Sequence, residues 1–185
     1  MDVSEAFQAV PRAWFLPEQE RARASYDGPL PIGSGQTNSQ PRTVRAMLRL
    51  LDVRAGLRVL DVGSGSGWTT GLLAELVGPE GEVLGLELEP DLVEFGRANL
   101  EHGDWPQARI EQATPGLLGD PDGAPYDRIL VSAEALELST ALVAQLSDDG
   151  RMVAPVNGEM LLVEARPGRA PKISKHGYYR FVPLR

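Results

Sequence analysis

The stretch Val59-Leu60-Asp61-Val62-Gly63-Ser64-Gly65-Ser66-Gly67 joins a short apolar run to three glycines at alternate positions. The apolar part predicts a buried strand, and residues 68–77 predict a helix. Glycines suit the turn between them because they adopt positive φ and let a ligand approach bare backbone. The next predicted strand, 81–89, carries Glu87 near its carboxyl end, where an acid can accept hydrogen bonds from ribose hydroxyls. The pattern indicates a βαβ unit that binds a nucleoside.

The spacing of the glycines distinguishes between nucleoside cofactors. A dinucleotide pattern, G-x-G-x-x-G, would need glycine at position 68 or 70, where Trp68 and Thr70 stand. The observed D-x-G-x-G-x-G resembles motif I of class I S-adenosylmethionine (SAM) methyltransferases. A pyrophosphate requires helix N-terminal N–H groups aimed at an anion, whereas the methionine tail of SAM requires only close passage of the backbone. An NAD enzyme is therefore disfavoured, and a glycine-rich turn without a ligand is the simpler alternative.

Composition restricts the class of protein. A chain of 185 residues with 42% hydrophobic and 24% charged residues fits one soluble domain. The net charge of −8 argues against a nucleic-acid partner, which requires a basic surface. No apolar run approaches the roughly 18 residues of a membrane span, and the acidic N-terminus lacks a secretory signal. With no cysteine and two histidines, disulfides, thiolate catalysis and a metal site are not expected. We expect a cytoplasmic monomer without a membrane partner.

Predicted helices and strands alternate along most of the chain. We expect helices at 4–10, 17–25, 41–51, 90–102 and 136–146, and a loop rich in glycine and proline at 27–40. Besides the two strands above, we expect strands at 109–112, 127–132, 151–156, 160–165 and 178–182, with a hairpin at Gly158. Such alternation implies a mostly parallel sheet that binds ligands at the carboxyl ends of its strands.

A second distinctive block is Pro29-Leu30-Pro31-Ile32-Gly33-Ser34-Gly35-Gln36-Thr37-Asn38-Ser39-Gln40-Pro41. It forms a stiff loop that leads into a helix, where Ser39 either caps the helix or presents its hydroxyl to a ligand. This block resembles the loop of the protein-L-isoaspartate O-methyltransferase family. Further segments that are similar to the family lie at residues 10–12, 124–127, 149–151 and 180–184. The resemblance covers about residues 10–185.

The resemblance implies a fold and an activity. The fold would be α/β, a Rossmann-like class I SAM methyltransferase with a mostly parallel seven-stranded sheet flanked by helices. One domain would span 1–185, with N-terminal helices and the active-site loop in 1–40 and the SAM-binding core in 41–185. Family members transfer the SAM methyl group to the carboxylate of an isoaspartyl residue in a damaged protein or peptide. The ester then collapses to a succinimide, which partly reopens as aspartate.

The same resemblance implies the site residues. Ser39 matches the family's active-site serine. The residues expected at SAM are Thr37, Asn38, Gln40, Asp61, Gly63, Ser64, Gly65, Ser66, Gly67, Glu87, Leu88, Gln112 and Ala113. For Asp61 two interpretations stay open, because it either supports the glycine turn through backbone hydrogen bonds or only ends a strand.

The chemistry needs no conventional base. A carboxylate with a pKa of about 3.9 is already ionised at neutral pH. The enzyme has to remove its water and hold one oxygen within roughly 3–3.5 Å of the methyl group. We expect the Ser39 hydroxyl to orient that carboxylate by hydrogen bonding and not to act as a nucleophile, since no histidine is placed to activate it.

Four departures from the family pattern leave the acceptor open. Asn38 replaces an apolar residue and would put a polar side chain in the active-site wall, and Ser34 replaces a frequent histidine. Gln112 stands where the family has an acid near the adenine of SAM. Glu134 either brings negative charge toward the acceptor site or is a solvated acid at a helix start. The alternatives to isoaspartyl repair are methylation of another peptide or small acid, and SAM binding without catalysis.

Overall fold

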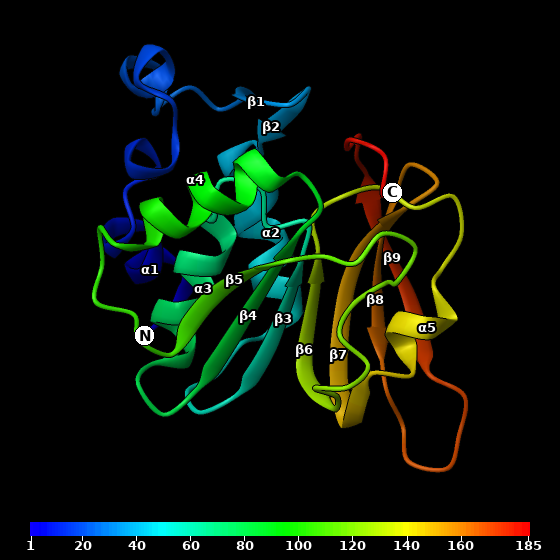
Figure 1. The fold of residues 1–185 in the computed structure, drawn as a ribbon. Coiled ribbons are helices and arrows are strands. Elements are labelled where there is room, and N and C mark those ends of the chain that lie inside the picture. Colours follow the sequence, from blue (N-terminus) through cyan, green and yellow to red (C-terminus); the bar gives the residue numbers. More distant parts are fainter.

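The computed structural model describes all of residues 1–185 and contains one seven-stranded sheet (Figure 1). Its strand order is β5-β4-β3-β6-β7-β8-β9. The strands are β3 (Arg58–Val62), β4 (Glu82–Glu87), β5 (Ala108–Gln112), β6 (Tyr126–Val131), β7 (Leu146–Val156), β8 (Glu159–Glu164) and β9 (Lys172–Tyr178). The pairs from β5 to β7 are parallel, and β8 and β9 are added antiparallel. The expected mostly parallel, seven-stranded sheet is confirmed.

Helices cover the two faces of the sheet unequally. The helices are α1 (Val3–Ala9), α2 (Pro41–Leu51), α3 (Trp68–Val77), α4 (Pro90–Leu100) and α5 (Thr140–Val143). A core of 20 buried residues joins α1, α2 and α3 to one face of the sheet. On the other face, a core of 13 residues contains Leu142 from the single turn α5, and the loop residues Ala113 and Leu118 pack against it. No helix is both long and apolar enough to span a bilayer.

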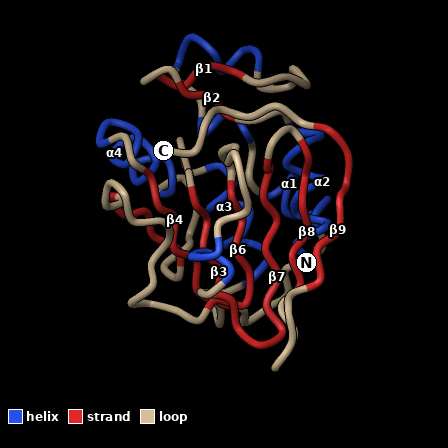
Figure 2. Tube along the Cα trace, turned by 90° about the vertical axis from the view of Figure 1, so that its right-hand side faces the viewer, coloured by secondary structure: helices blue, strands red, loops and turns tan.

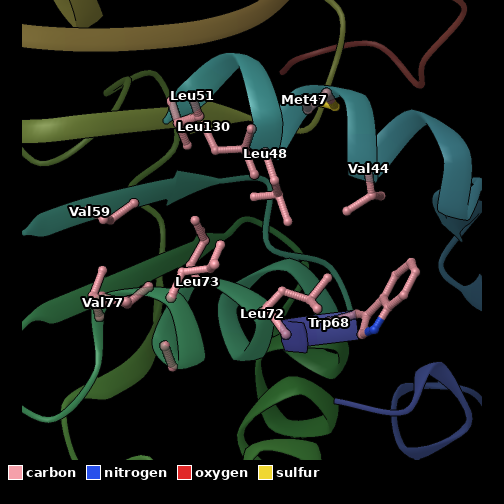
Figure 3. Close-up of a cluster of buried hydrophobic side chains, with 14 of the residues drawn as sticks. Val44, Met47, Leu48, Leu51, Val59, Trp68, Leu72, Leu73, Val77 and Leu130 are labelled. Atoms are coloured by element: carbon pink, nitrogen blue, oxygen red, sulfur yellow. The ribbon is translucent and has the colours of Figure 1, made fainter. Parts of the chain in front are cut away.

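The core on the larger side follows directly from sequence periodicity. Val44, Met47, Leu48 and Leu51 recur at helical spacing in α2, and all four are buried. Figure 3 shows these side chains facing α3 and the strands β3 and β6. Burying each such side chain contributes about 1.5–3 kcal/mol, so this layer holds α2 and α3 against the sheet. The expected helix from Pro41 and the helix 68–77 are confirmed.

The N-terminal extension has more structure than expected. The predicted helix 17–25 is a short 3-10 helix, η2 (Glu18–Arg23), preceded by another, η1 (Arg12–Phe15). The predicted loop 27–40 contains a hairpin of β1 (Leu30–Gly33) and β2 (Gln36–Asn38). The hairpin turn needs positive φ, which glycine adopts without strain, and φ is 101° at Gly33 and 70° at Gly35. Figures 1 and 2 place this hairpin at the same end of the sheet as the C-terminus.

Two C-terminal predictions are wrong. The segment 136–146 is helical only over α5, because Ala135 pairs with the end of β7, accepting from Asn157 N–H and donating to Pro155 carbonyl, and β7 already begins at Leu146. The last strand is Lys172–Tyr178 and not 178–182, because the turn after β8 closes at Arg166 and antiparallel pairing starts immediately with Glu164 opposite Lys172. Residues 180–184 instead cross to the end of β6, where Glu134 N–H donates to the Val182 carbonyl.

Candidate active site

The glycine turn joins β3 to α3 in a conformation that only glycine adopts freely. Gly63, Gly65 and Gly67 have φ of 78°, 55° and 89°. A Cβ on Gly67 would lie 2.9 Å from Ile110 Cδ1, and one on Gly65 would lie 3.2 Å from Ile32 Cδ1. The alternate spacing of the glycines is therefore a requirement of both backbone and packing.

Glu87 ties this turn to the end of β4. Its Oε2 accepts a hydrogen bond from Gly65 N–H at 2.8 Å, and its Oε1 accepts from Leu88 and Glu89 N–H at 2.7 and 2.9 Å. Gln112 contributes from β5, because its side-chain amide donates to the Leu88 carbonyl at 2.5 Å. The Glu87 carboxylate is buried but lines a cavity, so its remaining lone pairs face a ligand site.

Asp61 lies beneath the turn and does not line a cavity. It is fully buried, and its Oδ2 accepts from the hydroxyls of Thr69 and Thr70 at 2.7 and 2.8 Å. Its Oδ1 has no partner. Burial raises the pKa of the Asp61 carboxyl to about 6. Asp61 thus anchors the first turn of α3 by accepting from two side chains. The sequence had suggested either that Asp61 bonds to the backbone of the glycine turn or that it only ends a strand, and both interpretations are corrected.

Three hollows meet at this end of the sheet. The first, the glycine-turn cavity, lies between the glycine turn and the C-terminal segment and is lined by Gly63, Gly65, Glu87, Leu88, Ala113, Thr114, Leu117, Leu118, Pro183 and Leu184, among others. The second, the C-terminal cleft, is an open space of about 690 Å³ between residues 37–43 and 178–182. The third, the junction pocket, is small and polar and includes residues 37–39, 63–66 and Ser132.

Only Thr37 and Ser132 line all three hollows. Ser132 follows β6, and its N–H donates to the Val62 carbonyl at 2.8 Å, which fixes it beside the glycine turn. Its hydroxyl is buried and makes no hydrogen bond of standard geometry, but it lies close enough to the Asp61 carboxyl to lower the pKa of that group. Sequence reasoning did not assign Ser132 a role, although its place after a parallel strand is the position where ligands bind in such sheets.

Ser39 lines the C-terminal cleft and the junction pocket, and its hydroxyl makes no hydrogen bond within the protein. The residue before α2 is Gln40, which makes no side-chain cap. The alternative that Ser39 caps this helix is therefore wrong. Its carbonyl accepts from Arg12 Nη2 at 2.9 Å, so the backbone is held while the hydroxyl stays available.

Arg12 organises this loop and was missed as a site residue. Its guanidinium is buried and donates to the side chain of Asn38 and to five backbone carbonyls, those of Ala24, Tyr26, Gly28, Asn38 and Ser39. Burial lowers the pKa of Arg12 to about 10, which leaves it charged at neutral pH. In the sequence, Arg12 stood out only as part of residues 10–12, a segment that is similar to the family.

Asn38 lines the junction pocket, and its side-chain amide is bonded on both sides within the protein. Its Oδ1 accepts from Arg12 Nε at 2.7 Å, and its Nδ2 donates to Ser66 Oγ at 3.2 Å. The Asn38 amide therefore connects Arg12 to the glycine turn. Of the other residues expected at SAM, Gly67 and Gln112 line none of the three hollows, whereas Ser64 and Ser66 line the junction pocket and Gln40 lines the C-terminal cleft.

Glu134 is also committed to the fold. Its Oε1 accepts from Gly158 N–H at 2.8 Å and its Oε2 from Phe181 N–H at 3.1 Å. No helix starts at Glu134. The interpretation of Glu134 as a solvated acid at a helix start is therefore wrong, whereas the effect of its charge on the acceptor stays a prediction. Glu134 holds the C-terminal segment against the hairpin between β7 and β8.

Comparison with known proteins places this site in a family. A sequence profile of protein-L-isoaspartate(D-aspartate) O-methyltransferase (PCMT) matches residues 1–185. The chain belongs to the protein-L-isoaspartate O-methyltransferase family. It is 44% identical to the Methanopyrus kandleri member over 98% of this chain and 82% of that one, and 43% identical to the Methanothrix thermoacetophila member over 95% and 90%.

A solved family structure supports the assignment of the fold. A protein-L-isoaspartate O-methyltransferase from Plasmodium falciparum, in complex with S-adenosyl-L-homocysteine, superposes with a TM-score of 0.83 at 27% identity. The match covers 99% of this chain and 89% of that one. The Rossmann-like methyltransferase fold expected from the glycine turn is confirmed.

Proposed function

We propose that this chain is a SAM-dependent methyltransferase that esterifies the carboxylate of L-isoaspartyl residues in damaged proteins or peptides. The observation that carries the proposal is the meeting of the glycine-turn cavity and the C-terminal cleft at Thr37 and Ser132, beside the free hydroxyl of Ser39. A cofactor in the cavity and an acceptor in the cleft would meet at that point. Family membership supplies the identity of both.

The glycine-turn cavity fits SAM. Ten of its 20 lining residues are hydrophobic, among them Ala113, Leu117 and Leu118, and these suit the adenine. Glu87 would accept a ribose hydroxyl with the carboxylate lone pair that its three backbone donors leave free. The glycine turn and the unpartnered Ser64 hydroxyl border the methionine tail. SAM supplies a methyl group on a positively charged sulfonium.

The C-terminal cleft receives the acceptor. Ser39 donates its hydroxyl hydrogen to one carboxylate oxygen and thereby fixes the direction of the other. The acceptor is ionised at neutral pH, so the protein removes water from it and does not need to remove a proton. The hydroxyl is well suited to this task because Arg12 holds the Ser39 backbone at 2.9 Å.

Two of the residues that depart from the family pattern, Asn38 and Glu134, have structural roles in this protein. The Asn38 amide is bonded to Arg12 and Ser66, and the Glu134 carboxylate is bonded to two backbone N–H groups. The Asn38 amide is therefore engaged within the protein, and the Glu134 carboxylate keeps its charge but is held in place by the backbone of the C-terminal segment and of the hairpin. Gln112 remains a difference near the adenine end, where its amide supports Leu88.

Transfer of a labelled methyl group to paired peptides tests the proposal. The peptides differ only in isoaspartate or aspartate, and SAM binding is measured by calorimetry on the same protein. We expect labelling of the isoaspartyl peptide alone, and a kcat at least about 100-fold lower in Ser39→Ala with unchanged SAM affinity. SAM binding without labelling of either peptide would refute the repair function. Full activity of Ser39→Ala would refute the role of Ser39.

A further inference from the structure

The C-terminal cleft is positively charged in a chain of net charge −8. Its 12 lining residues include Arg42 and Arg180 but no aspartate or glutamate. One wall is the start of α2 with Ser39, and the other is the C-terminal segment Tyr178–Val182. The cleft therefore differs in sign from the molecule as a whole. Such a local field attracts anionic groups of a ligand.

Arg180 is the cation with no partner of its own. Its neighbours Tyr179 and Phe181 both pack against the larger hydrophobic core, so the alternation of an extended chain directs Arg180 away from it. The backbone on either side is held, because Tyr179 N–H donates to the Gly158 carbonyl and Phe181 N–H to Glu134. The Arg180 side chain is exposed and forms neither an ion pair nor a hydrogen bond.

The acids nearest to this wall are already engaged. Asp27 accepts from the backbone and the side chain of Arg42, with the ion pair at 3.0 Å. Glu134 accepts from Gly158 and Phe181 N–H. Arg42 is therefore partly neutralised, and this exposed pair costs little to exchange for another carboxylate. Arg180 forms no ion pair within the protein, although the charged Glu134 carboxylate accepts from the neighbouring Phe181 N–H. Its guanidinium is therefore available to a carboxylate of a polypeptide that enters the cleft.

We propose that the C-terminal cleft selects damaged polypeptide segments that carry acidic residues beside the isoaspartyl residue, and that Arg180 is the residue determining this preference. This inference rests on the proposed function for the identity of the acceptor. The flanking carboxylate pairs with Arg180 while the isoaspartyl carboxylate reaches Ser39. Because Arg180 does not touch the reacting atoms, the preference falls on KM and leaves kcat unchanged.

Isoaspartyl peptides that differ only in flanking residues test the proposal. Two positions on each side carry glutamate, glutamine or lysine. At low ionic strength we expect KM for the glutamate peptide to be about fivefold lower than for the glutamine peptide, equivalent to about 1 kcal/mol, and KM for the lysine peptide to be higher. We expect the preference to disappear in about 0.5 M salt, because exposed charges are then screened.

Charge-matched variants assign the effect to the cleft. In Arg180→Gln the preference for glutamate flanks should fall below about twofold, with KM for the glutamine peptide unchanged. Arg49→Gln alters the net charge equally from an exposed, unpaired position in α2 outside the cleft, and should keep the full preference. Equal KM values for the three peptides, or a preference that survives Arg180→Gln, would overturn the proposal.

A binding measurement separates this proposal from the proposed function. Fluorescence anisotropy of the same labelled peptides reports their affinity whether or not a methyl group is transferred. If no peptide is methylated, the repair function fails, while tighter binding of the glutamate peptide that is lost in Arg180→Gln would still support the charge selection. If the isoaspartyl peptides are methylated with equal KM and equal affinity, the repair function stands and the charge selection fails.

Discussion

Replacing Arg12 with lysine should weaken the fold and the site together. Arg12 donates six hydrogen bonds, one of them at 3.4 Å, and five of the six acceptors are backbone carbonyls of the N-terminal extension and the active-site loop. Lysine keeps the charge but has three donors on a compact ammonium group and lacks the planar fork. At least three acceptors therefore lose their partner.

The expected loss of stability is large for one conservative change. Each lost bond to a charged donor costs about 1–1.5 kcal/mol where water partly replaces it, so three lost bonds cost about 3–4.5 kcal/mol. For a domain of this size that corresponds to a fall in Tm of about 10 °C. Urea titration gives the free energy of unfolding, and calorimetry gives Tm.

Arg21→Lys is the matched control. Arg21 lies in the same extension but donates a single bond, from Nε to the Leu16 carbonyl at 3.2 Å, so its replacement should cost less than about 0.5 kcal/mol. Arg12→Lys should also lower kcat at temperatures where it is fully folded, because the Ser39 carbonyl loses its anchor. Equal stability and activity of the two variants would refute the reasoning.

Three further changes test other parts of the site. Glu87→Gln should weaken SAM binding at least about tenfold by calorimetry, because an amide cannot accept all three N–H groups that the carboxylate accepts; unchanged affinity would argue against the ribose contact. Glu134→Ala should raise KM for the isoaspartyl peptide by freeing the C-terminal segment, whereas the exposed Glu137→Ala should not. For Asp61, a folded pKa of about 6 against 3.8 means that the native state holds the extra proton between these values, so stability falls as pH rises through this window. The unfolding free energy of the wild type minus that of Asp61→Asn should fall by about 2 kcal/mol from pH 4 to pH 7, and a constant difference would show that the pKa is not raised.

The parts predicted best from sequence are those governed by local rules. The apolar face of α2 follows from spacing at Val44, Met47, Leu48 and Leu51, and the glycine turn follows from a need for positive φ. Both requirements are visible within a few residues. The parallel direction of the strands from β5 to β7 then follows from the alternation of strands and helices.

The parts predicted worst depend on contacts between distant segments. The segment 136–146 carries a helical pattern, yet Ala135 bonds to residues at the end of β7, more than 15 positions away. Arg12 acts on carbonyls 12 to 27 positions along the chain, which no local pattern marks. The hydrogen-bond partners of Asn38 and Glu134 were not predicted for the same reason, because they come from other elements.

A structure of the ternary complex with S-adenosyl-L-homocysteine and an isoaspartyl peptide tests the central claim most directly. We expect the cofactor product in the glycine-turn cavity with its ribose at Glu87. We expect the isoaspartyl carboxylate within hydrogen-bond distance of Ser39 Oγ, facing the sulfur between Thr37 and Ser132. A peptide bound outside the C-terminal cleft, or a carboxylate directed away from Ser39, would contradict it.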